Sequence, residues 1–134
     1  MKKKQIHCPY CGAKASLRPA SAVYGTATKV PDSYLYVCDR YPRCDSYVGA
    51  HKRTKEPMGT LANGDLRNKR IQAHKAFDWM WKSGLMTKWQ AYKWMQGKLA
   101  LTDEQAHIAK FSEYMCDRLI IECNRALENQ SIAA

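Results

Sequence analysis

Two pairs of cysteines carry the clearest chemistry in the sequence. Two residues separate Cys8 from Cys11, and five separate Cys38 from Cys44. A two-residue interval lets one tight turn present both sulfurs to the same metal ion, and Gly12 eases the backbone after that turn. Four sulfur ligands fit the tetrahedral coordination of zinc and leave no open position for a substrate. The sequence therefore predicts one structural zinc ion held by these four cysteines.

Disulfide bonds and a redox-active Cys-x-x-Cys pair are the alternatives to a metal ion at these positions. The lysines after Met1 carry the positive charge of a signal peptide, but no apolar run follows them. No stretch reaches the roughly 20 apolar residues that span a bilayer. We therefore expect a cytoplasmic chain without membrane contact. In the cytoplasm, clustered cysteines bind metal ions more often than they form disulfide bonds. His7 is a further candidate ligand, but it adjoins Cys8 and points elsewhere in an ordinary zinc knuckle.

The chain changes character near Pro57, which predicts two domains, residues 1–57 and 58–134. The first contains the cysteine pairs and the strand-length segments 22–24 and 34–37, separated by turns. It has too few large apolar side chains for a self-sufficient core, a deficit that zinc can offset with on the order of 10 kcal/mol of folding free energy. We expect an α+β fold, with a four-cysteine zinc ribbon of short antiparallel strands followed by a three-helix unit.

Three helices are expected in the second domain. The first covers residues 63–82 and ends before Gly84. The second and third begin at Thr87 and Thr102, because each threonine stands three residues before a glutamine, the spacing of a capping box. The third helix continues to Leu127. The apolar stripe of the first helix comprises Leu66, Ile71, Phe77, Met80 and Trp81.

The charge is strongly positive and concentrated in the first domain. The chain has a net charge of +10. Residues 1–57 have 11 Lys/Arg against 4 Asp/Glu, whereas residues 58–134 have 11 against 8. A positive field concentrates polyanions, so nucleic acid is the first partner to consider. A basic surface that only keeps the protein soluble is the alternative.

The ribbon also has the residue types that bind single strands. Aromatic faces stack on bases at roughly 1–3 kcal/mol each, while Lys and Arg follow the phosphates. We expect backbone-driven binding of DNA, single-stranded DNA in particular, although the residues do not separate DNA from RNA. The tyrosines can instead form the core of the ribbon. The candidate contacts are Arg18, Tyr34, Tyr36, Arg40, Tyr41, Arg43, Lys52 and Arg53.

These motifs resemble a known kind of zinc ribbon. The pattern consists of Cys-Pro-x-Cys-Gly from Cys8, then Leu17-Arg18, Tyr24-Gly25, Cys38 and Tyr41-Pro42-x-Cys44. Over about residues 6–51 it is similar to the four-cysteine ribbons at the C-terminal ends of bacterial type IA topoisomerases. The resemblance implies zinc on the same four cysteines and a module that helps to hold single-stranded DNA. The longer interval between the cysteine pairs implies an extra loop over residues 26–32, and nothing resembles a topoisomerase catalytic domain.

The whole chain also resembles a family of small zinc-finger-containing proteins of bacteria and their phages. In that family a ribbon of this kind precedes a helical segment like the one that starts at residues 61–63.

The helical half suggests a different function. Four tryptophans crowd into a short span, Trp79, Trp81, Trp89 and Trp94. They can fill the core between the helices, or their surplus can mark an interface with a protein partner or a second copy. The alternative function is therefore a protein-interaction module, such as a phage or bacterial regulatory factor.

The sequence contains no pattern typical of an enzyme. It has no phosphate-cradling glycine loop, no His-Glu-x-x-His helix and no serine elbow. Cys116 and Cys123 are seven residues apart and share a helical face, where buried free thiols are a better explanation than a second metal site. We therefore expect a binding protein without catalytic activity.

Overall fold

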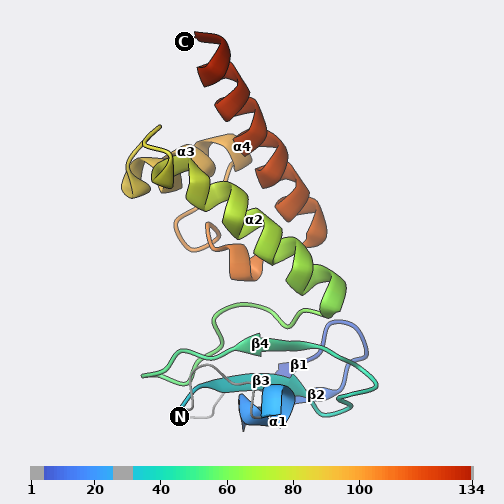
Figure 1. Cartoon of the computed structure of the whole chain (residues 1–134). Coiled ribbons are helices and arrows are strands. Elements are labelled where there is room, and N and C mark those ends of the chain that lie inside the picture. Colours follow the sequence, from blue (N-terminus) through green and yellow to red (C-terminus); the bar gives the residue numbers. More distant parts are fainter. Residues whose placement is uncertain (1–4, 26–31, 134) are drawn as a thin grey trace. The chain divides into compact units, whose positions relative to one another are not determined.

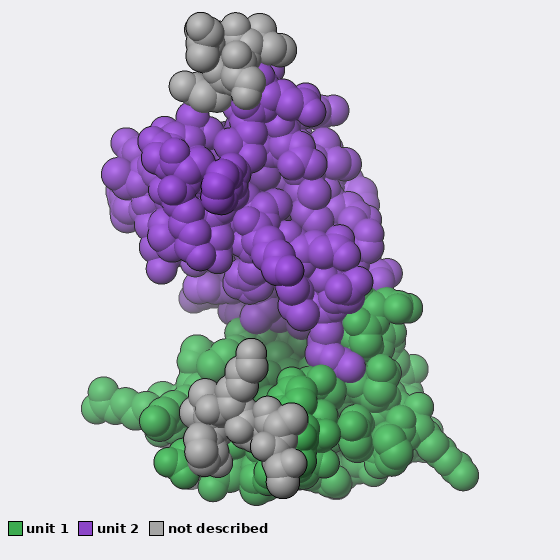
Figure 2. All heavy atoms as spheres, viewed as in Figure 1, with its two compact units in different colours: residues 1–65 green, residues 66–134 purple. Residues whose placement is uncertain are grey.

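The computed structural model describes residues 5–25 and 32–133. The chain divides into two compact units, residues 1–65 and 66–134 (Figure 2). The first unit is built on a sheet and the second on helices (Figure 1). The expected α+β class, with strands and a cysteine cluster before the helices, is confirmed.

The first unit contains a four-stranded antiparallel sheet in the order β1-β2-β3-β4 (Figure 1). Its strands are β1 (Ile6–His7), β2 (Lys14–Pro19), β3 (Tyr34–Cys38) and β4 (Tyr47–Gly49). Strand β3 contains the segment 34–37 that the sequence predicted as a strand. Each strand pairs with its neighbour in the sequence.

A small apolar cluster lies on each face of this sheet. Side chains alternate along β3, so Cys38 lies on one face and Val37 on the other. The first cluster consists of Cys8, Cys38, Val48 and Leu61. The second consists of Ala20, Leu35 and Val37. Two of the four buried residues in the first cluster are cysteines of the predicted metal site.

The prediction of a strand over residues 22–24 was wrong. These residues lie in α1 (Ser21–Tyr24), a single helical turn in which the N–H groups of Val23 and Tyr24 both donate to the carbonyl of Ala20. The turn places Val23 against the second apolar cluster and the Tyr24 ring 5.8 Å from that of Tyr47. Tertiary packing thus overrides the strand propensity of these residues. The extra loop expected over residues 26–32 lies outside the described residues except for Asp32.

The second unit contains three long helices. They are α2 (Gly64–Lys82), which begins just before the unit boundary, α3 (Lys88–Leu99) and α4 (Glu113–Ala133). A 3-10 turn, Ile108–Lys110, precedes α4. The buried side chains of this unit include Phe77, Met80, Met95, Leu119 and both remaining cysteines, Cys116 and Cys123.

The two predicted capping boxes had different outcomes. At the start of α3, the Thr87 hydroxyl accepts from the Gln90 N–H and the Gln90 side chain accepts from the Thr87 N–H, which confirms that prediction. The same reciprocal bonds form between Thr102 and Gln105, but no helix continues from them, so the predicted start of the third helix was wrong. The backbone is extended at His107, so the helical conformation does not continue past this residue.

The interruption has a packing reason. Positions 106, 108 and 111 do not lie on one face of a continuous helix. Because the helix is interrupted, Ala106, Ile108 and Phe111 are all buried. Helix α4 begins only at Glu113, where the Ser112 hydroxyl accepts from the Met115 N–H.

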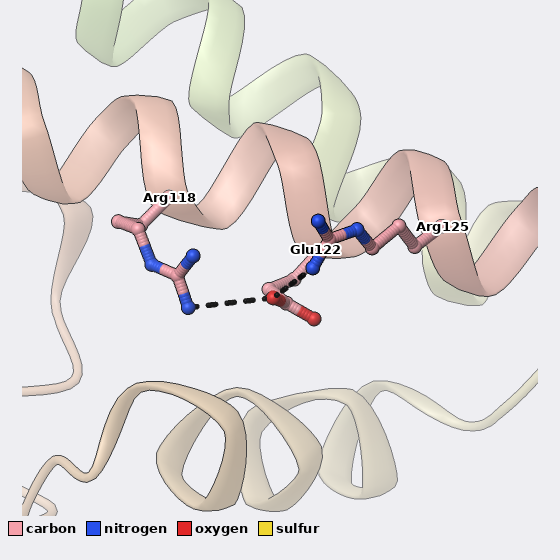
Figure 3. A network of polar contacts seen from close by, with 3 residues as sticks. All are labelled: Arg118, Glu122 and Arg125. Atoms are coloured by element: carbon pink, nitrogen blue, oxygen red, sulfur yellow. Dashed lines mark hydrogen bonds and ion pairs between the residues drawn. The ribbon is translucent and has the colours of Figure 1, made fainter.

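Two charged side chains are buried in the helical unit. The Nε–H of Arg70 donates to the carbonyl of Phe111 over 3.0 Å. Oε1 of Glu122 lies 3.4 Å from Arg118 and 3.3 Å from Arg125, one turn to either side on α4 (Figure 3). Each buried charge therefore has polar partners. The predicted stripe residue Ile71 is exposed, because Arg70 takes the buried position next to it.

Among the described residues, no helix combines the length and the apolar character that crossing a membrane requires.

Candidate metal centre

The four predicted cysteines converge in the first unit. Their Sγ atoms all lie within 4.8 Å of one another. The Sγ atoms of Cys8 and Cys44 are 3.5 Å apart, and those of Cys11 and Cys38 are 3.4 Å apart. We call the loop that contains Cys8 and Cys11 the first loop, and the one that contains Cys38 and Cys44 the second loop. Each pair of sulfurs joins one cysteine of the first loop to one of the second, so the two loops face each other across the site.

Local hydrogen bonds form the first loop. Cys8 directly follows β1, and its N–H donates to the carbonyl of Ala13 over 2.7 Å. The Gly12 N–H donates back to the Cys8 carbonyl over 2.9 Å. Gly12 has a φ of +78°, a left-handed conformation that glycine adopts without strain. The turn predicted from the Cys-x-x-Cys-Gly motif is therefore present.

The sheet positions the second loop. Cys38 is the last residue of β3, and its N–H donates to the carbonyl of Ser46. The loop closes on itself where the N–H of Tyr41 donates to Cys38 and the N–H of Cys44 donates to Arg40. Because β1 pairs with β2 and β2 with β3, the end of β3 is brought beside the first loop.

The donor set fits a metal ion. A tetrahedron with metal–sulfur bonds of about 2.3 Å separates its sulfurs by roughly 3.8 Å, close to the spacing of these Sγ atoms. All six cysteines of the chain are free thiols. Cys8 and Cys38 are buried, whereas Cys11 and Cys44 are half-buried. The four cysteines are therefore placed to bind a metal ion in a closed, all-sulfur site.

Two of the thiols have pKa values that shift in opposite directions. Burial raises the pKa of Cys8, but hydrogen bonds from the backbone N–H groups of Tyr10 and Cys11 and contacts with Cys44 and Ser46 outweigh burial and lower it to about 7. Burial raises the pKa of Cys38 to about 12. A cation among the sulfurs would favour the thiolate at every position, since metal binding releases the thiol protons.

A basic pocket adjoins the site. A cavity of about 600 Å³ is lined by the second loop and by one residue of the first. Arg40 and Arg43 contribute exposed side chains to it, and Tyr41 contributes a half-buried one. The remaining lining residues are Cys11, Asp39, Pro42 and Cys44. Three of the predicted nucleic-acid contacts thus lie together beside the metal centre.

Tyr34 and Tyr36 share a face of β3, as the period of a strand predicts. Both already have a partner in Lys55. The Lys55 Nζ lies 4.1 Å from the centroid of the Tyr34 ring, and the Tyr36 hydroxyl donates to the Lys55 carbonyl. Lys55 itself has a left-handed φ of +61°. No local pattern in the sequence points to this lysine, because only the fold of the turn brings it over the sheet.

The remaining predicted contacts are dispersed. Arg18 lies 3.6 Å from the carboxylate of Asp39, so its charge is partly neutralised. Lys52 and Arg53 are exposed in the turn between His51 and Glu56, where the His51 N–H donates to the Glu56 carbonyl. This turn follows β4, which runs antiparallel to β3, so it lies at the opposite end of β3 from the metal centre.

The comparison with known families agrees with this geometry. Residues 4–126 match the model of a family described as a zinc-finger-containing domain. No curated protein and no solved structure is significantly similar to the chain. The likeness to topoisomerase ribbons is unconfirmed and remains a resemblance between short motifs.

Proposed function

The chain belongs to this family of zinc-finger-containing domains, and from that premise we propose that it binds nucleic acid through a surface held in shape by one structural zinc ion. Four cysteine ligands complete the coordination of zinc, so the ion has no position at which to bind a substrate. The role of the metal is then to hold the sheet and its loops together.

The pocket beside the cysteines is the observation that carries this proposal. It combines the exposed guanidinium groups of Arg40 and Arg43 with the ring of Tyr41. Neither arginine has an ion-pair partner in the described part of the chain. Guanidinium groups form paired hydrogen bonds to phosphate oxygens, and an adjacent aromatic face can stack on a base. The pocket therefore suits a phosphodiester with its base.

The far end of the sheet can extend this surface. Lys52 and Arg53 add two exposed charges beyond Tyr34, so basic groups stand at both ends of β3. Strand β3 runs for five residues, roughly 13 Å between its end Cα atoms. A flexible single strand can bend to contact both ends, and we therefore favour single-stranded DNA over a rigid duplex.

The test is fluorescence anisotropy with labelled single-stranded DNA, duplex DNA and single-stranded RNA of equal length, titrated over a salt series. Affinity should fall steeply with added salt, with single-stranded DNA bound most tightly. The double variant Arg40→Ala/Arg43→Ala should bind at least tenfold more weakly, and its salt dependence should be shallower by about 1.4 on a log–log plot.

Lys98→Ala is the matched control, because it removes an exposed charge from the end of α3. Absence of binding at low salt, or equal loss in Lys98→Ala and in the arginine variant, would reject the proposal. Metal analysis of the purified chain should give one zinc ion per molecule, and a stoichiometry of zero or two would reject the structural role assigned to the ion.

A further inference from the structure

Three lysines lie over two tryptophan rings in the helical unit, at the end of α2 and in α3. The Nζ atoms of Lys82 and Lys88 lie 5.4 Å and 5.3 Å from the centroid of the Trp81 ring. The Nζ of Lys93 lies 5.8 Å from the Trp89 ring, one turn along α3. We call these five residues the tryptophan–lysine row.

The row is open to solvent. Trp89 is 69% exposed, the largest exposure of any tryptophan in the chain. The three lysines are exposed as well, whereas Trp81 is half-buried. The exposed Trp89 ring therefore offers a flat face on which a nucleic-acid base can stack.

The charge around the row is positive. Lys82 is 3.9 Å from Asp78, and Lys93 is 3.5 Å from Asp103. Lys88 has no ion-pair partner in the part of the chain that the structure describes, and the first turn of α3 has no acidic residue. The N-terminal turn of a helix adds a partial positive charge of its own. An anion is therefore the ligand that this surface favours.

We infer that the tryptophan–lysine row is a second nucleic-acid-binding site, at which a base of a single strand stacks on Trp89 and phosphates contact Lys88 and Lys93. A nucleotide supplies a flat ring and an anion in the same ligand, which matches residues that present both ring faces and ammonium groups. The site is in the helical unit and does not depend on the arginine pocket of the first unit.

Two other occupants fit the row less well. An apolar protein surface would have to desolvate the ammonium group of Lys88, which has no ion-pair partner in the described part of the chain, without neutralising it, and this is unfavourable. A second copy of the chain would bring two sets of lysines together, and like charges repel. An acidic peptide would neutralise the lysines but offer no flat ring to Trp89. Charge and ring faces together therefore favour nucleic acid over the protein partner considered from the sequence.

The test uses the zinc-loaded full chain and fluorescein-labelled oligo(dT) and oligo(U) in anisotropy titrations. Trp89→Ala should weaken binding about tenfold, and Trp89→Phe, which retains an aromatic face, should restore most of the affinity. Lys88→Gln/Lys93→Gln should make the salt dependence shallower by about 1.4 on a log–log plot.

Trp79→Ala and Lys75→Gln are the matched controls and should leave the affinity unchanged. Trp79 is also exposed, but it stands two residues before Trp81 and so points to a different side of α2. Equal affinities of Trp89→Ala and Trp79→Ala would overturn the inference. Tighter binding of phosphatidylserine vesicles or of a poly-glutamate peptide than of the oligonucleotides would also overturn it.

The arginine variants separate this inference from the proposed function. If Arg40→Ala/Arg43→Ala loses affinity while the row variants do not, the row is not a binding site and the proposed function stands. If only the row variants lose affinity, the row binds nucleic acid and the arginine pocket does not. Circular dichroism of each variant should match that of the unchanged chain, and the lysine variant gives an independent result if Trp89→Ala is destabilised.

Discussion

The Sγ atoms of Cys8 and Cys44 lie 3.5 Å apart, although 36 positions separate the two residues in the sequence. Among the described residues, the apolar cluster around them has four buried members, and two of these, Cys8 and Cys38, are cysteines of the site itself. Without a cation, ionised thiols at this distance repel one another, and neutral thiols contribute little more than a small apolar group. Metal binding and folding of the first unit are therefore expected to be thermodynamically linked.

Removal of the metal should unfold the first unit selectively. Excess chelator, or Cys38→Ser, should abolish the dispersed amide resonances of the sheet. Helices α3 and α4 and most of α2 belong to the second unit, so most of the circular dichroism signal at 222 nm should persist. The measurement is a two-dimensional NMR spectrum of the chain with and without chelator, together with metal analysis.

Cys116→Ala provides the control for that experiment, because it removes a buried cysteine that belongs to the helical unit. This variant should bind as much metal as the unchanged chain. A dispersed sheet spectrum that survived complete metal removal would show that the apolar clusters are sufficient on their own.

Local motifs predicted structure well where their own residues determine it. The Cys-x-x-Cys-Gly motif predicted the turn at Gly12, and the capping box predicted the start of α3 at Thr87. The same box at Thr102 forms its hydrogen bonds but starts no helix. Burial of Ile108 and Phe111 determines the backbone conformation of this segment. The spacing of the capping box carries no information about which later residues pack in the core.

The position of Lys55 illustrates what the sequence could not predict. Its contacts with Tyr34 and Tyr36 join residues that are 21 and 19 positions apart in the sequence. They depend on a turn in which Lys55 itself has a left-handed backbone conformation, unusual for a residue other than glycine. Period-two spacing placed both tyrosines on one face, but it could not show what covers that face. Long-range contacts of this kind follow from the assembled sheet and not from a local pattern.

Tyr36→Phe should loosen the turn between His51 and Glu56. The substitution removes the hydrogen bond from the tyrosine hydroxyl to the Lys55 carbonyl, which should destabilise the turn by about 1 kcal/mol. Amide hydrogen exchange at His51 and Lys55, whose N–H groups bond within the turn, should become faster. Tyr34→Phe is the matched control, since the ring under the Lys55 ammonium is retained. Equal exchange rates in both variants would show that the hydroxyl contributes nothing.

Arg70→Met should destabilise the helical unit. The side chain is buried, and its Nε–H donates to the carbonyl of Phe111, which joins α2 to the segment before α4. Methionine fills similar space but leaves that carbonyl without this donor, which should lower the free energy of unfolding by about 1–3 kcal/mol. Urea denaturation followed by circular dichroism gives the free energy of unfolding. Lys75→Met, at an exposed position of α2, should change it by less than about 0.5 kcal/mol.

The buried thiols of α4 should make the helical unit less stable in alkali. Burial, together with the nearby carboxylate of Glu122, raises the pKa of Cys123 from 9.0 to about 12, and burial also raises the pKa of Cys116. The folded unit therefore keeps both protons at a pH where the unfolded chain releases them. The stabilisation is complete below pH 9 and is lost as the pH rises toward 12.

Comparison with Cys123→Val isolates this effect from other groups that titrate in the same range. Between pH 9 and pH 10, the free energy of unfolding should fall by about 1 kcal/mol more in the unchanged chain than in the variant. Urea denaturation at each pH provides the values, and equal slopes would mean that the Cys123 thiol ionises as readily in the folded unit as in the unfolded chain. A thiol reagent at pH 8 provides an independent check. After chelation it should modify four cysteines quickly and leave Cys116 and Cys123 unreacted, because the thiolate is the reactive form.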